Sequence, residues 1–124
     1  MNSINLENTY TSLPQEFFRY TEAEAMPDVN VITINKQLAD LLNIDIGFLK
    51  SQSGLRFLSG RNSKTLPNSI SLAYAGHQFG HLVPQLGDGR AVLLGDKICQ
   101  DGVRRDIQLK GSGKTYFSRG GDGR

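Results

Sequence analysis

Hydrophobic residues in the first half of the chain recur at a spacing that favours short helices. Ile34, Leu38, Leu41 and Leu42 fall on one face of a helical wheel, which predicts an amphipathic helix of about ten residues. Asp45 is a residue type that caps helix N-termini, so it predicts a second short helix directly after it. We therefore expect the front of the chain to be helical.

The rest of the first half carries weaker patterns. We expect an extended, mobile stretch up to Pro14, and a short helix over 14–18 whose two Phe side chains form a docking face. β-Branched residues predict a short strand over 29–34. The polar stretch 51–69 predicts turns, and 70–74 predicts a buried short helix or turn.

From Leu82 onward the pattern changes to short apolar runs separated by Asp-Gly turns, which are typical of β-hairpins. One turn is Gly87-Asp88-Gly89, and a second lies at 100–102. The expected strands cover 82–86, 90–94 and 106–110. The pattern predicts an α+β fold, in which N-terminal helices precede a small antiparallel sheet with a glycine-rich hairpin. A glycine-rich basic loop follows over 111–124.

Composition favours a compact domain without cysteine cross-links. The chain has 124 residues, 38% of them hydrophobic, and a single cysteine, which excludes an internal disulfide and a cysteine-cluster zinc site. Cys99 is expected to be a buried or half-buried apolar side chain. No secretory signal opens the sequence, and no stretch reaches the ~20 apolar residues of a membrane span. The expected location is the cytoplasm.

Charge and glycine are unevenly distributed along the chain. Residues 1–62 hold five Lys/Arg and seven Asp/Glu, whereas residues 63–124 hold nine and five, together with eleven of the fourteen glycines. Basic side chains among glycine turns favour a phosphate-bearing partner. On composition alone, a loop-rich, mildly basic surface is the simpler explanation.

The first candidate site is Gly87-Asp88-Gly89-Arg90. Gly87 and Gly89 allow a sharp turn and a close approach of phosphate to the main chain, and Arg90 adds a forked donor. Lys110 ends the last expected strand, and a lysine following a glycine-rich hairpin is the arrangement of kinases. The alternatives are an ordinary hairpin turn and a solvated strand-end lysine.

Two further segments contain residues suited to nucleotide binding. Residues 111–115 end in Gly-Lys-Thr, but position 108, where a phosphate-binding P-loop requires glycine, is Gln, so we reject a P-loop. In the last segment, Asp122 is suited to a ribose hydroxyl or a water, and the Gly123 amide to a phosphate. A flexible tail is the alternative there.

His77 and His81 have the spacing of metal ligands on one helix face. Gly76 and Gly80 weaken such a helix, and no third ligand is evident. We interpret both histidines as structural, and no metal ligand is assigned.

Four blocks of sequence, in this order and spacing, resemble the selenoprotein O family. They are 74–80 (YAGHQFG), 85–91 (QLGDGRA), 108–113 (QLKGSG) and 118–124 (SRGGDGR). The resemblance is clear from about Ile70 onward and looser over 29–49. It implies a protein-kinase-like fold, in a pseudokinase family that transfers AMP from ATP to Ser, Thr or Tyr hydroxyls of proteins. ATP is bound there in a flipped orientation, and members that transfer UMP with manganese are also described.

The resemblance also implies roles for particular residues. Gly87, Gly89 and Arg90 would contact the nucleotide phosphates, and Lys110 would be the strand lysine. Asp122 and Gly123 would contact the nucleotide from the second loop. Magnesium or manganese is expected in the full-length family.

Family members are several hundred residues long, so this chain corresponds to an N-terminal fragment that ends before the catalytic half. We assign it no catalytic residue. The expected division is an N-terminal extension over 1–28 and a partial kinase-like N-lobe with nucleotide-binding loops over 29–124.

The sequence thus predicts the ATP-binding portion of a protein adenylyltransferase, inactive in transfer on its own. The expected partners are ATP and protein acceptors, not nucleic acid or membrane. Two alternatives remain: a kinase-type phosphotransferase, and a non-catalytic binding fragment or remnant of an interrupted gene.

Overall fold

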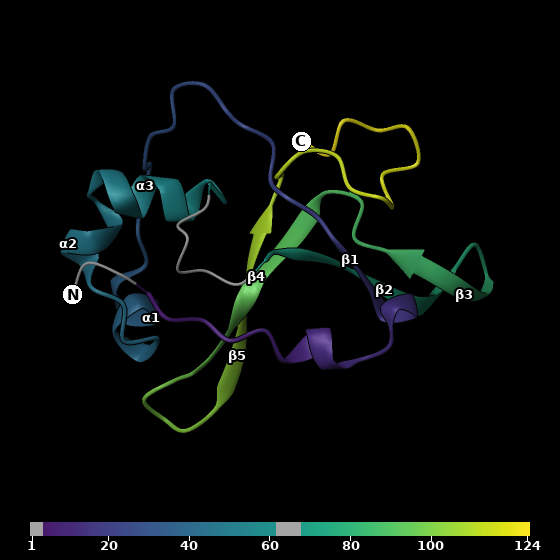
Figure 1. Cartoon of the computed structure of the whole chain (residues 1–124), viewed down its shortest axis with the longest axis horizontal. Coiled ribbons are helices and arrows are strands. Elements are labelled where there is room, and N and C mark those ends of the chain that lie inside the picture. Colours follow the sequence, from purple (N-terminus) through teal and green to yellow (C-terminus); the bar gives the residue numbers. More distant parts are fainter. Residues whose placement is uncertain (1–3, 62–67) are drawn as a thin grey trace.

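A computed structural model describes residues 4–61 and 68–124 of the chain. Short helices lie at one side of an antiparallel sheet, and the strands β2 and β3 extend away from them (Figure 1). The helices are α1 (Lys36–Leu41), α2 (Ile46–Leu49) and α3 (Gln52–Leu58), preceded by the 3-10 turns η1 (Thr9–Ser12) and η2 (Gln15–Phe17). The strands are β1 (Phe18–Tyr20), β2 (Ile70–Gln78), β3 (His81–Gly87), β4 (Ala91–Ile98) and β5 (Arg104–Lys110). The described residues therefore form an α+β unit.

Each α-helix begins at a side chain that caps it. Asn35, Asp45 and Ser51 each accept the backbone N–H three residues ahead, at 3.0, 2.8 and 3.1 Å. Such caps satisfy N–H groups that have no partner within the helix. The Asp45 cap confirms the second predicted helix, and α1 confirms the first, although α1 has six residues.

Several predictions for the first half are wrong. α3 occupies 52–58, where the polar pattern predicted turns; the rest of that prediction at 62–67 lies outside the described residues. Residues 29–34 form no regular element and pair with no described strand, and Ile32 is 98% exposed. β-Branched residues favour an extended backbone, but a strand also needs a neighbouring edge to pair with.

The opening segment lies against the sheet. Glu7 and Asp96 exchange backbone hydrogen bonds of 2.9 and 2.7 Å, and η1 follows, so this stretch is not simply extended. The helix predicted over 14–18 is only the 3-10 turn η2; Phe18 is buried in β1, whereas Phe17 is 49% exposed. The division of the chain at residue 28 stays a prediction.

β2 is a strand, not the short helix or turn predicted over 70–74. One half of it pairs with β1 and β4, and the other half pairs with β3. The β2–β3 hairpin turns at Phe79 and Gly80, whose φ values are 56° and 78°. Two consecutive positive φ values are the geometry of a tight hairpin turn that matches the strand twist.

The glycine-rich segment 87–90 is not the hairpin turn that the sequence predicted. It joins β3 to β4, and both of these strands pair with β2. Gly87 lies opposite Ala73, and Leu93 lies opposite Ile70, so the segment holds extra residues that bulge out between two successive pairings. We call residues 87–90 the glycine loop.

β4 is the central strand and is buried on both faces. Val92 and Leu94 pack with the helices, and Leu93 packs with Phe18 and Ile70 on the opposite face. A strand buried on both faces reads as a continuous apolar run, which explains why the sequence revealed β4. The β4–β5 hairpin around 100–102 confirms the second predicted turn.

Cys99 is buried, as expected. Among the described residues no helix is long and apolar enough to cross a membrane; α3, the longest, has seven residues.

Candidate nucleotide-binding site

The glycine loop and the end of β5 lie side by side. Ala91, the first residue of β4, is opposite Lys110, the last residue of β5. The backbone N–H groups of Gly111 and Ser112 both donate to the Arg90 carbonyl, at 2.7 and 3.3 Å. Sheet pairing therefore places Lys110 next to Arg90.

Residues 111–124, the C-terminal segment, fold back over the glycine loop. The Thr115 hydroxyl donates to the Asp88 carbonyl, and the Ser118 hydroxyl donates to the Gly89 carbonyl at 2.6 Å. Both acceptors are main-chain oxygens. These two hydrogen bonds hold the backbone of the glycine loop and do not involve the loop's own side chains.

Phe117 packs directly on Gly87. A Cβ atom at Gly87 would lie 2.2–2.5 Å from three carbons of the Phe117 ring, well inside van der Waals contact. The absence of a side chain at Gly87 is thus needed by the protein's own packing. From the sequence, this glycine is predicted only to turn the chain and to admit phosphate.

Asp122 and Gly123 return to the same place at the end of the segment. Gly113 donates its N–H to the Gly123 carbonyl at 3.1 Å, and Gly123 is buried with φ 73°. A Cβ at Gly123 would lie 1.8 Å from the Gly113 carbonyl oxygen. Asp122 is exposed, and its Oδ1 accepts the Arg124 N–H at 3.1 Å.

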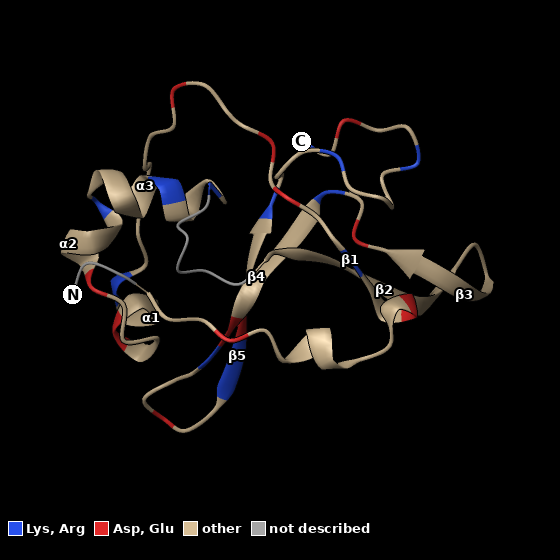
Figure 2. Cartoon of the chain, viewed as in Figure 1, with Lys and Arg blue, Asp and Glu red and all other residues tan. Residues whose placement is uncertain are grey.

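The structure thus gathers the predicted residues around the start of β4 and the end of β5. They are Gly87, Gly89, Arg90, Lys110, Asp122 and Gly123. Arg90 and Lys110 are both exposed, and neither forms an ion pair with another described residue. The C-terminal segment carries three basic residues, Lys114, Arg119 and Arg124, and one acidic residue, Asp122 (Figure 2).

Asp88 points into the fold. Its Oδ2 accepts the Gln108 side-chain N–H at 3.3 Å and lies 3.4 Å from the Leu72 backbone nitrogen, while its own N–H donates to the Leu72 carbonyl at 2.9 Å. Burial raises the pKa of the Asp88 carboxyl, and the Leu72 hydrogen bond opposes that rise. Asp88 therefore ties the glycine loop to β2 and β5.

Sequence reasoning missed most of the residues that support the site. Phe117 packs on the glycine loop, and the Glu24 carboxylate accepts hydrogen bonds from the Lys114 backbone and the Arg124 side chain in the C-terminal segment. The Arg19 guanidinium lies 4.9 Å from the centre of the Tyr116 ring, a cation–π contact from β1. No periodic pattern surrounds Glu24, so the sequence offered no signal for it.

One buried polar atom in this region lacks a partner. Ser112 is 4% exposed, and its hydroxyl makes no hydrogen bond among the described residues. An unpaired buried hydroxyl carries a free-energy cost, so this atom marks a place where a ligand oxygen or a water would be favourable.

The histidines do not share a helix face. His77 lies in β2 and His81 in β3, both exposed and close to the hairpin turn. His81 Nδ1 lies 3.1 Å from the Phe79 carbonyl oxygen. The described residues contain no group of three or more His, Cys, Asp or Glu that would hold a metal ion, and we assign no ligand for magnesium or manganese.

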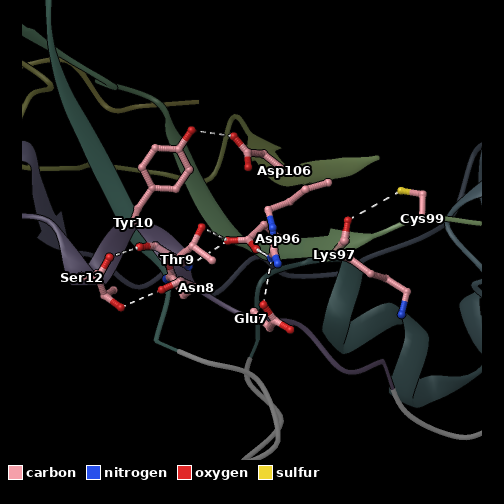
Figure 3. A network of polar contacts seen from close by, with 11 residues as sticks. Glu7, Asn8, Thr9, Tyr10, Ser12, Asp96, Lys97, Cys99 and Asp106 are labelled. Carbon is pink, nitrogen blue, oxygen red and sulfur yellow. Dashed lines mark hydrogen bonds and ion pairs between the residues drawn. The ribbon is translucent and has the colours of Figure 1, made fainter. Parts of the chain in front are cut away.

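A second polar network lies at the opposite end of the β4–β5 hairpin (Figure 3). Asp96 is fully buried, accepts the Thr9 N–H and hydroxyl at 2.9 Å each, and forms an ion pair with Arg104. Burial raises the pKa of Asp96, but the Thr9 and Arg104 contacts outweigh it, and the pKa is lowered overall. This network fastens the opening segment to the sheet, and none of the hydrogen bonds of the described residues joins it to the glycine loop.

Comparison with known proteins places the chain in a family. The family model described as "Protein adenylyltransferase SelO" matches residues 1–124. A "Protein nucleotidyltransferase YdiU" of Rhodopseudomonas palustris (strain BisB5) is 52% identical over 118 residues, which is 95% of this chain and 24% of the relative. Its namesake in Clostridium botulinum (strain Alaska E43 / Type E3) is 50% identical over 125 residues, 99% of this chain and 25% of the relative.

The chain spans about a quarter of the length of these curated relatives, as their 24% and 25% shares show. A match over the whole chain, together with identities near one half, is far more specific than the glycine blocks alone. The chain belongs to the protein adenylyltransferase SelO family, a family of nucleotidyltransferases.

Proposed function

We propose that the glycine loop, Lys110 and the Asp122-Gly123 turn bind ATP, and that the protein carrying this chain transfers AMP to Ser, Thr or Tyr hydroxyls of other proteins. One observation carries the proposal. Segments far apart in sequence meet at one end of the β4–β5 pair, held by the Gly111–Arg90 and Gly113–Gly123 hydrogen bonds. They bring two exposed cations and several glycines together there.

The chemistry of the gathered residues suits a triphosphate. Arg90 offers a fork of N–H donors, and Lys110 offers a compact positive charge on a strand end. Lys110 stands on backbone that pairs with Ala91 in the sheet, and the Arg90 carbonyl accepts the Gly111 and Ser112 N–H groups, so little backbone ordering cost remains when the phosphates bind. Glycine at positions 87 and 89 leaves the main chain open to an approaching oxygen.

The proposed transfer is a displacement at the α-phosphorus. An acceptor hydroxyl oxygen forms the new P–O bond, the bond to the β-phosphate oxygen breaks, and pyrophosphate leaves with the electron pair. The proton of the acceptor hydroxyl goes to a base that we do not assign within this chain. Arg90 and Lys110 would stabilise the negative charge of the phosphates while the substrate is held.

ATP binding is tested first on this chain with a matched pair of variants. Lys110→Ala removes the proposed phosphate contact, and Lys36→Ala removes an exposed lysine on α1. With magnesium or manganese present, ATP at about 100 times its Kd raises the free energy of unfolding by about 2.7 kcal/mol. We expect that gain for the unmodified chain and Lys36→Ala and a much smaller gain for Lys110→Ala. Equal gains in both variants would refute the proposed site.

The transferred group is tested on the longer protein that contains this sequence. Label from α-labelled ATP on a protein acceptor, lost in Lys110→Ala, is the expected result. A glycine loop with a strand lysine also serves kinases, so the rival is phosphoryl transfer. Label from the γ-phosphate in place of the α-phosphate would establish that rival.

A further inference from the structure

Glu24 joins the chain ahead of the helices to both ends of the C-terminal segment. Its backbone N–H donates to the Ser112 carbonyl at 2.8 Å. Its Oε1 accepts the Lys114 backbone N–H at 3.1 Å, and its Oε2 lies 3.2 Å from Nη2 of Arg124. One residue therefore holds positions 112, 114 and 124.

The stem of Glu24 also packs on Gly113. A Cβ atom at Gly113 would lie 2.4 Å from Cγ of Glu24, and φ of Gly113 is 104°. Gly113 is in turn the donor to the Gly123 carbonyl. The Glu24 side chain thus packs on Gly113, whose hydrogen bond to Gly123 brings Gly123 beside the end of β5.

Charge favours the same arrangement. The Lys114 N–H hydrogen bond is the main cause that lowers the pKa of the Glu24 carboxyl; burial, the next largest cause, raises it, and Arg124 lowers it further, so that the pKa is lowered overall. The carboxylate is therefore ionised at neutral pH. It balances Arg124 at a place where Arg90 and Lys110 already concentrate positive charge.

We propose that Glu24 is a positioning residue for nucleotide binding, which sets the 111–114 turn and the Arg124 side chain so that Lys110 and Gly123 face one ligand. This inference rests on the proposed ATP site. Glu24 acts through the backbone of Ser112 and Lys114 and through Arg124, and it does not touch the nucleotide. It lies outside all four sequence blocks, in the segment that leads from β1 to the helices.

Two substitutions separate the contacts of Glu24. Glu24→Gln keeps an oxygen for the Lys114 N–H but loses the charge that Arg124 faces, and Glu24→Ala loses both. Glu22→Gln is the matched control, because Glu22 is an exposed acid two residues earlier with no side-chain hydrogen bond among the described residues. Each variant of this chain is assayed for its thermal midpoint without ligand and for its Kd for ATP, well below that midpoint.

We expect Glu24→Gln to raise the ATP Kd about three- to fivefold, the upper part of the range for losing one solvent-exposed ion pair, and Glu24→Ala to raise it further. The Kd of Glu22→Gln should stay within about twofold of the unmodified chain. Reversing the pair, as Glu24→Arg with Arg124→Glu, should recover only part of the affinity lost in Glu24→Arg alone, because the ion pair is rebuilt but arginine has no acceptor for the Lys114 N–H.

The outcomes distinguish the two proposals. If Lys110→Ala weakens ATP binding while Glu24→Gln and Glu22→Gln have the same Kd, the positioning role is wrong and the ATP site stands. A lower thermal midpoint with an unchanged Kd in Glu24→Gln also overturns it, since the role is then structural only. If Lys110→Ala and the unmodified chain bind ATP alike, the ATP site itself fails.

Discussion

Gly87 provides the sharpest test of how the glycine loop is built. Its φ is not in the left-handed region, so the backbone itself tolerates a side chain. The obstacle is the Phe117 ring, three carbons of which lie 2.2, 2.3 and 2.5 Å from the position of a Cβ. Carbon atoms pack best at about 3.5–4.0 Å, so in Gly87→Ala the ring must move by more than about 1 Å.

Overpacking of this kind costs about 1–3 kcal/mol. For a domain of this size we expect the thermal midpoint of Gly87→Ala to fall by roughly 4–12 °C without any nucleotide. Phe117→Ala removes the obstacle. A double-mutant cycle on the free energy of unfolding should therefore show that Gly87→Ala costs about 1 kcal/mol or less when Phe117 is alanine.

The control is Gly102→Ala in the β4–β5 turn. No atom lies within 4 Å of a Cβ there, but φ is 77°, so its cost is that of a strained backbone and should not depend on Phe117. The measurement is urea or thermal unfolding of the four chains of the cycle and of the control. An equal cost of Gly87→Ala with and without the Phe117 ring would refute the reasoning.

Three further predictions concern the opposite end of the β4–β5 hairpin. Asp96→Ala should lower the free energy of unfolding by about 3 kcal/mol, because it leaves Thr9 and Arg104 without their buried partner. Asp106 is exposed and accepts one hydrogen bond, from the Tyr10 hydroxyl. Asp106→Ala should therefore lower the free energy of unfolding by less than about 1 kcal/mol, when both variants are measured by denaturant titration. Asp101 has its pKa lowered to about 2, first by the Arg105 side chain and then by the Val103 N–H. Because this pKa is lowered in the folded state, the ionised carboxylate stabilises the fold at pH values above its usual pKa of 3.8. That stabilisation is lost as the pH falls to about 2. The thermal midpoints of Asp101→Asn and the unmodified chain should therefore differ at pH 6 and converge near pH 2. A gap that stays constant over that range would contradict the assignment.

The sequence predicted elements whose pattern is local. The Asp45 cap, the apolar positions of α1 and the continuous apolar run of β4 each depend on neighbours in the chain, and all three are present. It missed β2, because Gly76 and the residues around it show no clear alternation. β2 is a strand because β1, β3 and β4 supply edges for it, which a local pattern does not contain.

The glycine loop shows the limit of turn signals. Gly87-Asp88-Gly89 between apolar runs predicts a turn between paired strands, but β3 and β4 each pair with β2 instead. Asp-Gly indicates where the backbone bends sharply and not which strands pair across the bend. The bend was therefore placed correctly, and its partners were not.

The candidate site divides in the same way. Its proposed ligand contacts stand in glycine-rich blocks that are specific to a family, and the sequence was sufficient to select them. The residues that hold those blocks together come from elsewhere, as Glu24 and Arg19 do. Contacts between residues 90 or more positions apart, such as Glu24 and Lys114, produce no periodic pattern in a single sequence.

Two different constraints can require glycine in such a loop, and the sequence alone does not distinguish them. A phosphate that approaches the main chain excludes a Cβ, and so does an aromatic ring of the protein packed on the same atom. At Gly87 the Phe117 ring lies where a Cβ would be, so packing alone is sufficient to require glycine there. The Phe117→Ala background separates the constraints, because it relieves the packing and leaves the approach of phosphate unchanged. If Gly87→Ala then regains stability but still binds ATP weakly, both constraints act on the same glycine. If it regains stability and affinity together, Gly87 supports the fold, and the proposed phosphate contacts shift to Gly89 and Arg90.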